Sequence, residues 1–473
     1  LKSIYNIDKV ENANVMKSNK VEGNIHILLW CSPGFGFLDV WLPVVKILKE
    51  RYNAKIDFVF PEPSSIKLED KNSDLFNIAE QYVSNVIYRG YSGRWLVSSS
   101  LLEAHTKIQF SGFDEMILRF STRLTKGRLS KYQSLKITGK YVSIIAKKII
   151  YIKENFKHLV LYDFSLLSGV DCILYDITKE HKIVNRELTD RFKNTFKFSM
   201  LHGLSPAWLS SGFTCEHLVE KRLDVAVYCM SDLERDGYNK CFGVLDANII
   251  HTGIPRQDKN WIKFICNKSS FDEHEPFVFI IGRPASAYMT VERKKQALVD
   301  IYDTVCNKYK LNLVIKVHPK ESINGVDGKI YNSALGMDNY GKTWMFSDVH
   351  PFVLGKKSVF AISFYSGVVM DMLAIKKPVI EYLNLKGLPL YDNSKSLRDE
   401  YGDPVFKFRY AKLVLGASSK LELDNHVKSI LNKYEDVSLL LYSKYRDYFA
   451  LYNNASMSVA EDICKRINCS IDL

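Results

Sequence analysis

Short apolar runs alternate with amphipathic stretches of helix length along most of the chain. The first run, IHILLW at 25–30, precedes the turn sequence SPGFGFLD and then VWLPVVKILKERY at 40–52, whose apolar residues recur at helical spacing. The next run, AKIDFVF at 54–60, ends in proline. Because a strand, a glycine-containing turn, a helix and a second strand begin a parallel sheet, the pattern predicts an α/β fold.

The alternation continues in two series, which predicts two α/β domains. The polar stretch at 259–276 interrupts it, and we interpret this stretch as an interdomain linker. Strands are expected at 158–162, 171–175, 196–201, 225–229, 248–251, 277–282, 311–317, 358–364 and 378–383, with a helix over 293–309. We expect a disordered leader at 1–22, an N-terminal α/β domain at 23–262 with a helical insertion near 114–157, a C-terminal α/β domain at 272–425, and C-terminal helices at 426–473.

Composition excludes several classes of protein. Of the 473 residues, 47% are hydrophobic, which is enough for a large core. The nine cysteines are scattered and lack a CxxC pair, which argues against a disulfide framework and against a zinc ribbon. The sequence has no run of about 18 apolar residues and no apolar signal segment. We therefore expect a cytoplasmic protein that does not span a membrane.

The charge points to an anionic partner. Lys+Arg 65 against Asp+Glu 53 gives a net charge of +12, and residues 114–157 carry many of the basic side chains among Tyr, Ile, Leu and Phe. Such a stretch can lie on an anionic membrane surface or hold a polyanionic acceptor; the alternative is a solvated helix face. Since the sequence has no helix-turn-helix, RRM or zinc-knuckle pattern, no nucleic acid partner is expected.

Candidate chemistry is expected where strands meet helices, because ligands of parallel sheets bind at the carboxyl ends of the strands. Gly34 and Gly36 follow the first strand without the GxGxxG spacing of a dinucleotide site, so an acceptor-side or tight-turn role is expected. His202, in MLHGLSP, is a candidate general base or a hydrogen-bonding turn residue. Asp176 ends a strand and is a candidate carboxylate base, with helix capping as the alternative.

Three further junctions lie later in the chain. In HTGIPRQD, Arg256 and Asp258 are expected to form an ion pair at the hinge between the domains, with a position facing the cleft as the alternative for Arg256. His318 in VHPK, with basic neighbours, is placed to meet a phosphate or a base. The third junction, AISFYSGVVMD, offers hydroxyls and amides as a phosphate cradle, with simple N-capping as the alternative.

Taken together, the later junctions resemble the CDP-glycerol glycerophosphotransferase family of teichoic acid and capsule assembly. The matching pieces are MLHGLSPAW, CMSDLERDGYNKCFG with IIHTGIPRQD, VIKVHPKE and SFYSGVVMDMLAIKKPVIEY, within residues 196–385. The resemblance implies a GT-B fold, in which two Rossmann-like α/β domains face each other across a cleft. It also implies a cytidine-nucleotide donor held by the C-terminal domain and a glycan or lipid-linked acceptor on the N-terminal side.

Carried over by residue, the resemblance makes His202 the catalytic base and His318 a donor-binding histidine. Ser366 becomes the phosphate-cradle serine and Asp371 its following acid, while Arg283 is a candidate for stabilising the leaving phosphate. No cofactor is required, and a divalent metal is optional. The expected donor-binding residues are His318, Lys320, Ser363, Ser366, Gly367, Asp371 and Arg283.

The expected function is therefore a transferase of bacterial capsule, teichoic acid or lipopolysaccharide assembly, located in the cytoplasm or peripherally on the inner face of the cell membrane. It would move a polyol phosphate or a sugar from the cytidine-nucleotide donor to a glycan hydroxyl. The first alternative is a transferase that depends on CMP-sialic acid or CMP-Kdo, since HP motifs followed by serine-rich helix starts resemble those capsule enzymes. The second is a UDP-sugar epimerase, which would require paired carboxylates in the cleft.

Overall fold

The computed structural model describes most of the chain. The described residues are 25–32, 35–62, 73–90, 95–109, 116–117, 120–121, 123–125, 132–156, 169–179, 190–201, 221–231, 234–272, 275–449 and 454–471. The expected leader, the expected strand at 158–162, and the candidates Gly34 and His202 lie outside these ranges.

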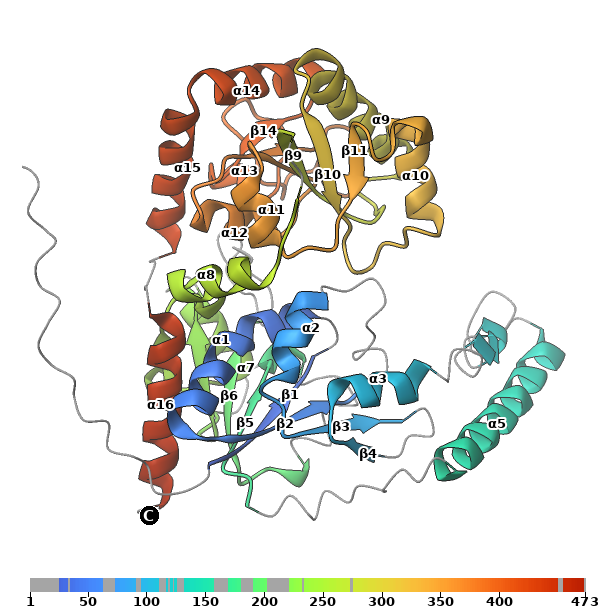
Figure 1. The fold of residues 1–473 in the computed structure, drawn as a ribbon, viewed down its shortest axis with the longest axis vertical. Helices are drawn as coiled ribbons and strands as arrows, with labels where there is room; N and C mark the ends of the chain where they lie inside the picture. Colours follow the sequence, from blue (N-terminus) through green and yellow to red (C-terminus); the bar gives the residue numbers. More distant parts are fainter. Residues whose placement is uncertain are drawn as a thin grey trace, which may run out of the picture.

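The first sheet has eight strands in the order β4-β3-β2-β1-β5-β6-β7-β8 (Figure 1). All neighbouring strands are parallel except β3 and β4, which are antiparallel. Buried apolar side chains on both faces explain why the expected runs read as continuous rather than alternating patterns. The strands are β1 (His26–Trp30), β2 (Lys55–Phe60), β3 (Asn85–Arg89), β4 (Trp95–Ser98), β5 (Cys172–Tyr175), β6 (Phe196–Met200), β7 (Val225–Cys229) and β8 (Ile249–His251).

The second sheet has six strands, all parallel, in the order β11-β10-β9-β12-β13-β14. Its central strand β9 is buried along its whole length. The strands are β9 (Phe277–Ile281), β10 (Asn312–Lys316), β11 (Trp344–Phe346), β12 (Ala361–Ser363), β13 (Val379–Tyr382) and β14 (Leu415–Ala417). The two sheets confirm the expected α/β fold with two Rossmann-like domains.

Helices cover both sheets and connect them. In the first domain these are α1 (Phe35–Tyr52), α2 (Ser73–Glu80), α3 (Leu101–Gln109), α5 (Gln133–Phe156) and α7 (Arg235–Phe242). In the second they are α9 (Val291–Tyr302), which continues into the π-helical turn η8 (Asp303–Lys308), α10 (Val326–Leu335), α11 (Pro351–Lys357), α12 (Val368–Ala374), α13 (Lys407–Tyr410), α14 (Lys420–Asn432) and α15 (Tyr434–Tyr448). Short 3-10 turns are η4 (Ile177–Lys179), η6 (Asp246–Asn248), η7 (Pro255–Gln257) and η9 (Met337–Asn339), and α8 (Lys259–Lys268) and α16 (Ala455–Ile471) complete the set.

The expected linker is mainly a helix. Its first ten residues form α8, which lies between the two domains with Trp261 and Ile265 buried. The apolar positions of this segment recur at helical spacing among polar residues, so its polarity indicated an amphipathic helix rather than an irregular linker.

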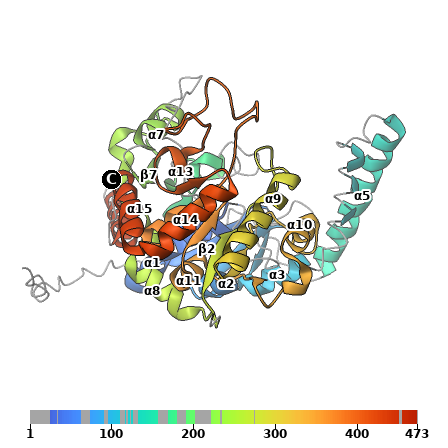
Figure 2. The same cartoon turned by 90° about the horizontal axis from the view of Figure 1, so that it is seen from above.

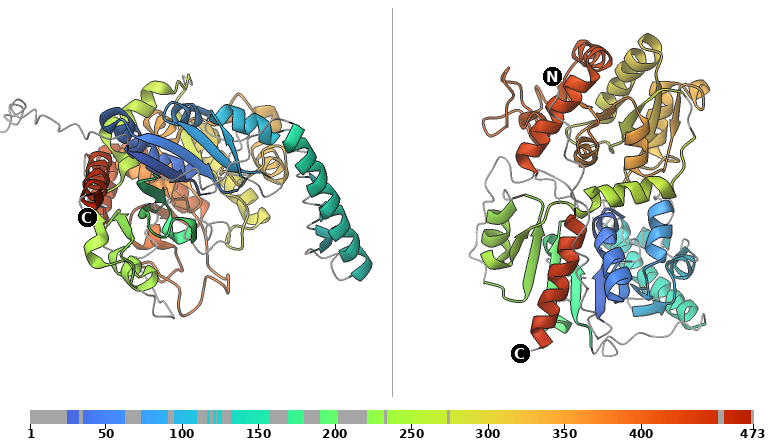
Figure 3. Two further views of the ribbon diagram at one scale, coloured as in Figure 1. Left: turned by 90° about the horizontal axis from the view of Figure 1, so that it is seen from below. Right: turned by 60° about the vertical axis from the view of Figure 1, so that its left-hand side comes forward.

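The last helix, α16, returns to the first domain and packs beside α1 over the sheet (Figure 3). The hydroxyl of Tyr228 on β7 donates to Asp462 Oδ2 at 2.9 Å, and Arg466 Nη1 donates to Asn248 Oδ1 at 3.0 Å. The chain therefore crosses between the domains twice, at α8 and again before α16.

Helix α5 stands at the side of the first domain, apart from both sheets (Figure 2). Gly139 faces the short helical segment before it, where an added Cβ would lie 2.8 Å from Leu124 Cβ. The opposite face is exposed and apolar: Ile137, Tyr141, Ile144, Ile145 and Ile149 are 50%, 64%, 52%, 57% and 40% exposed. In the part of the chain that the structure describes, no helix has both the length and the apolar character to cross a membrane.

Candidate functional site

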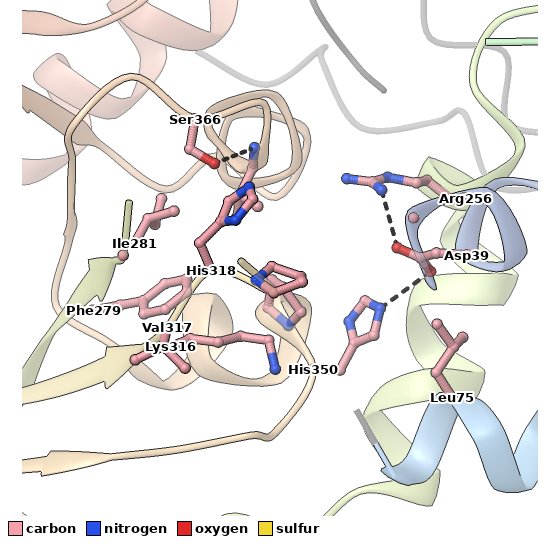
Figure 4. Close-up of a pocket in the computed structure, with 15 residues that line it drawn as sticks. Asp39, Leu75, Arg256, Phe279, Ile281, Lys316, Val317, His318, His350 and Ser366 are labelled. Carbon is pink, nitrogen blue, oxygen red and sulfur yellow. Dashed lines mark hydrogen bonds and ion pairs between the residues drawn. The ribbon is translucent and has the colours of Figure 1, made fainter. Parts of the chain in front are cut away.

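The two domains enclose a cavity of about 170 Å³ between α1 and α2 on one side and the carboxyl ends of β9, β10 and β12 on the other (Figure 4). Parallel strands present their ligand-binding loops at this edge. The first domain contributes Gly36, Asp39, Leu75 and Arg256, and the second contributes Phe279, Ile281, Gly282, Lys316, Val317, His318, Pro319, His350, Pro351, Ser366 and Val368. The cavity therefore brings together three of the sequence candidates, His318, Ser366 and Arg256, with Gly36 at its rim.

His318 is held by its own loop. Its backbone N–H donates to Glu321 Oε2 at 2.5 Å, and its ring Nδ1 accepts the backbone N–H of Lys320 at 3.1 Å. An Nδ1 that accepts leaves Nε2 as the protonated nitrogen of the neutral ring. His318 is therefore set up as a hydrogen-bond donor rather than as a proton acceptor.

Glu321 in turn is fixed by a buried network. Lys294 Nζ, which is fully buried on α9, donates to Glu321 Oε1 at 2.5 Å, and the Tyr331 hydroxyl donates to the same oxygen at 2.9 Å. The Lys294 ammonium also lies 4.4 Å from the centroid of the Tyr331 ring. A buried charge pair with such partners holds the loop of His318 in one position.

The serine junction after β12 forms a tight turn. Ser366 N donates to Ser363 Oγ at 3.1 Å, and Val368 N donates to Ser366 Oγ at 3.4 Å, so the two serines cap the turn. Ser363 and Ser366 are both buried, but only Ser366 lines the cavity, while Gly367 is the N-cap residue of α12. Tyr365 has φ 72°, an uncommon left-handed conformation for a bulky residue that is found at functional turns.

Arg256 does not pair with Asp258, which corrects the sequence expectation. It donates from Nη1 to Asp39 Oδ2 at 3.0 Å and makes a two-point contact with Asp371, from Nε to Oδ1 at 3.0 Å and from Nη2 to Oδ2. Burial alone would lower the pKa of Arg256, but Asp371 and Asp39 raise it above its ordinary value. Asp371, expected on the donor side, thus binds an arginine of the first domain.

Asp258 has a different role. It accepts the backbone N–H groups of Ala455 at 2.9 Å and Ser456 at 2.8 Å, and so it caps the start of α16. The neighbouring Gln257 donates to Asp371 Oδ1 at 3.1 Å and accepts from the Tyr445 hydroxyl. The turn 255–258 therefore joins the first domain to α12, α15 and α16, as expected of a hinge segment but through other partners.

Two cavity residues were missed as candidates. His350 is the middle residue of a second Val-His-Pro tripeptide, 32 residues after the first. Its Nε2 lies 3.2 Å from Asp39 Oδ1, and its Nδ1 accepts the Phe352 N–H at 3.2 Å. The repeated tripeptide is the signal that could have identified it. The second is Lys316, one of the basic neighbours of His318 in the sequence, and burial lowers its pKa to about 8.

Arg283, Lys320 and Asp176 do not line the cavity. Arg283 donates from Nε to the Tyr288 hydroxyl at 2.7 Å, and Lys320 is exposed. Asp176 is buried, and its Oδ1 accepts the N–H of Thr178 at 2.9 Å and its hydroxyl at 2.6 Å, which is the pattern of a cap. The candidate base His202 belongs to a part of the chain outside the described residues.

A further buried acid, like Asp176, lies at the carboxyl ends of the strands of the first sheet. Glu234 follows β7, and its Oε2 accepts the Met230 N–H at 2.8 Å, while its Oε1 has no hydrogen-bond partner among the described residues. Burial raises the pKa of Glu234 to about 7. No local pattern in the sequence marks Glu234, because its burial comes from the surrounding fold.

No cysteine is among the described residues that line the cavity. Within the described ranges, no group of three or more His, Cys, Asp or Glu side chains could hold a metal ion. Cys241 on α7 is disulfide-bonded, whereas Cys31, Cys172, Cys229, Cys266, Cys306 and Cys464 are free thiols.

Comparisons with known proteins identify the class of fold. No family model and no curated protein matches the chain. Among solved structures, a variant of the wall teichoic acid polymerase TagF matches with a TM-score of 0.51 and 11% identity, covering 96% of this chain and 92% of that one. Together with the two sheets and the cavity between them, this likeness shows a GT-B fold.

Two more matches are of the same quality. A TagF variant soaked with CDPG matches with a TM-score of 0.50 and 11% identity, covering 96% of this chain and 92% of that one. A UDP-N-acetylglucosamine 2-epimerase from Listeria monocytogenes, described as a putative one, matches with a TM-score of 0.50 and 10% identity, covering 94% of this chain and 97% of that one. At these identities the matches show the fold alone.

Proposed function

We propose that the protein is a transferase of bacterial surface-polysaccharide assembly that moves a polyol phosphate or a sugar from a cytidine-nucleotide donor to a glycan hydroxyl. The observation that carries the proposal is the cavity, in which His318, Lys316 and Ser366 of the second domain face Arg256 of the first. Cationic and N–H donors that converge at the carboxyl ends of parallel strands suit a phosphate group.

Each residue has a role in this proposal. His318 donates its Nε2–H to a phosphate oxygen of the donor, and Lys316 adds positive charge beside it. The turn at Ser366 places a hydroxyl at the same edge. His202 acts as the base that takes the proton of the acceptor hydroxyl, a step worth about 10²- to 10⁴-fold in rate. The leaving nucleotide phosphate is stabilised by the cations of the cavity.

The choice between donors rests on the resemblance over residues 196–385. CDP-glycerol or a related CDP-polyol fits the His202, His318 and Ser366 motifs, whereas CMP-sialic acid or CMP-Kdo is the alternative for which Asp176 would serve as base. Its capping contacts with Thr178 favour the first choice.

A UDP-sugar epimerase is the second candidate because such an enzyme shares the fold. An epimerase needs groups that remove and return a proton. Among the residues that line the cavity, in the described part of the chain, Asp39 is the single carboxylate, and Arg256 and His350 engage both of its oxygens. The cavity therefore favours a transferase.

A donor panel tests the proposal. The protein is incubated with CDP-glycerol, CDP-ribitol, CMP-sialic acid, CMP-Kdo and UDP-N-acetylglucosamine, and nucleotide release is measured with and without a glycan acceptor. We expect release from one cytidine donor that increases with acceptor. Turnover of the UDP-sugar without acceptor would instead identify an epimerase.

We also infer a peripheral position on the inner face of the cell membrane. The exposed face of α5 combines Ile137, Ile144 and Ile145 with Lys136, Lys140 and Lys148, which are exposed on the same helix. A helix with an apolar face flanked by lysines binds anionic lipid surfaces. This position would bring a lipid-linked acceptor close to the first domain.

A further inference from the structure

The described lining of the cavity has more basic side chains than carboxylates. Arg256, Lys316, His318 and His350 all line it, and Asp39 is its one carboxylate among the described lining residues. Arg256, His350 and Asp39 are 7%, 2% and 7% exposed. Arg256 already has Asp371 as a partner, but its Nη1 and the N–H of His350 still need an acceptor, because a buried donor without one is costly.

Asp39 of the first domain supplies that acceptor. It belongs to α1, and its Oδ2 accepts from Arg256 Nη1 at 3.0 Å while its Oδ1 lies 3.2 Å from His350 Nε2 (Figure 4). Burial alone would raise the pKa of Asp39, but His350, Arg256 and Lys316 lower it below its ordinary value. Asp39 is therefore an ionised carboxylate at neutral pH.

The two Val-His-Pro tripeptides are built alike. In each, the ring Nδ1 accepts the backbone N–H of the second residue after the histidine, Lys320 at 3.1 Å and Phe352 at 3.2 Å. Each ring therefore keeps its proton on Nε2 when neutral. His350 donates this N–H to the carboxylate of Asp39. A Val-His-Pro histidine held in this way can therefore bind an oxyanion.

We propose that Arg256, His350 and Lys316 form a second phosphate subsite and that the Asp39 carboxylate occupies it when no ligand is bound. The inference rests on the proposed function, since the ligand would be a phosphate group of the nucleotide donor. A phosphate can accept from a guanidinium and an imidazole N–H as a carboxylate does, and it carries more charge.

The proposal predicts a link between binding and domain movement. Asp39 comes from the first domain, whereas His350 and Lys316 belong to the second. A phosphate that takes the place of Asp39 breaks the His350–Asp39 contact between the domains. Donor binding is therefore expected to release the contact between α1 and His350, while the Arg256–Asp371 pair still joins the two domains.

The test is phosphate affinity with and without the internal carboxylate. Binding of pyrophosphate and of CDP is measured by calorimetry for the wild type, for Asp39→Asn and for Glu50→Gln. Glu50 lies on the same helix, is exposed and undergoes the same change of charge. We expect Asp39→Asn to bind pyrophosphate about tenfold more tightly than the wild type, and Glu50→Gln to stay within about twofold of it.

Unchanged or weaker pyrophosphate binding by Asp39→Asn would overturn the proposal, because Asp39 would then organise the site rather than compete with the ligand. If Asp39→Asn does not fold, Asp39→Ser is measured, and failure of both to fold would show that the carboxylate is structural and also overturn it. The proposed function fails separately, if the wild type binds pyrophosphate but no cytidine nucleotide.

Discussion

Arg256 and Asp371 are 115 residues apart in the sequence and form a buried two-point ion pair between the two domains. Arg256 also binds Asp39, so one guanidinium contacts two buried carboxylates beside the cavity. The planar guanidinium can meet both carboxylates at once, which a lysine ammonium cannot do with the same geometry. The relative position of the domains therefore depends in large part on this side chain, together with the His350–Asp39 and Gln257–Asp371 contacts.

Replacing Arg256 tests that dependence. Arg256→Met leaves Asp39 and Asp371 buried without their main cation, and breaking such a pair costs about 3–5 kcal/mol. We expect a clear fall in thermal unfolding temperature, partly restored in the double variant Arg256→Met/Asp371→Asn, which removes one of the unpaired charges. Equal melting of Arg256→Met and the wild type would show that the ion pair does not hold the domains.

The lowered pKa of Lys316 leads us to expect that donor binding depends on pH. Its pKa in the ligand-free protein is lowered to about 8 by burial. Below that pH the ammonium is already charged and affinity is flat; above it, binding must take up a proton, so affinity falls by up to about tenfold per pH unit. Calorimetry with CDP from pH 6.5 to 9.5 measures the slope.

The matched variant is Lys316→Arg, whose guanidinium stays charged over this range. We expect its affinity to lose the alkaline decline. An identical slope in the wild type and in Lys316→Arg would assign the decline to another group.

Substitutions at His318 distinguish a hydrogen-bond donor from a group that transfers a proton. Its Nδ1 accepts the Lys320 N–H, so the ring offers Nε2–H to the cavity side. A glutamine amide can supply an N–H near the place of Nε2, whereas alanine cannot. We expect His318→Ala to weaken CDP binding by about 10- to 100-fold and His318→Gln to keep most of it. Equal loss in both variants would contradict the assigned donor role.

Helix α5 predicts membrane binding that depends on its apolar face. The double variant Ile144→Asp/Ile145→Asp places two charges on that face, where both side chains are more than half exposed. We expect it to lose sedimentation with vesicles of anionic lipid, while folding is unchanged because these side chains pack little.

Leu421→Asp is the control, since Leu421 is 70% exposed on α14 of the second domain. It should sediment as the wild type does. Wild-type protein that fails to bind anionic vesicles would contradict the inferred position.

The sequence predicted most of the sheet framework because long apolar runs mark strands that are buried on both faces. It missed β11 and β14, which have three residues each, and β3 and β4, whose runs end in polar residues. In such short elements, neighbouring strands rather than local pattern determine the structure. The helix expected over 293–309 was found, with its second part as a π-helical turn.

The candidate site was predicted less completely. His318 and Ser366 could be located because each follows a recognisable strand, and both line the cavity. The partners of Arg256 could not be predicted, because Asp39 and Asp371 are 217 and 115 residues away in the sequence and no local pattern links them to Arg256. Asp258 was chosen as partner because it is near in sequence, but its carboxylate is used to cap α16.

The most direct test of the account is a crystal structure of the protein soaked with CDP. We predict nucleotide density with its phosphates beside His318 and Ser366 and its contacts confined to the cavity between the domains. Nucleotide bound on another surface, or binding of UDP with no binding of CDP, would contradict the account.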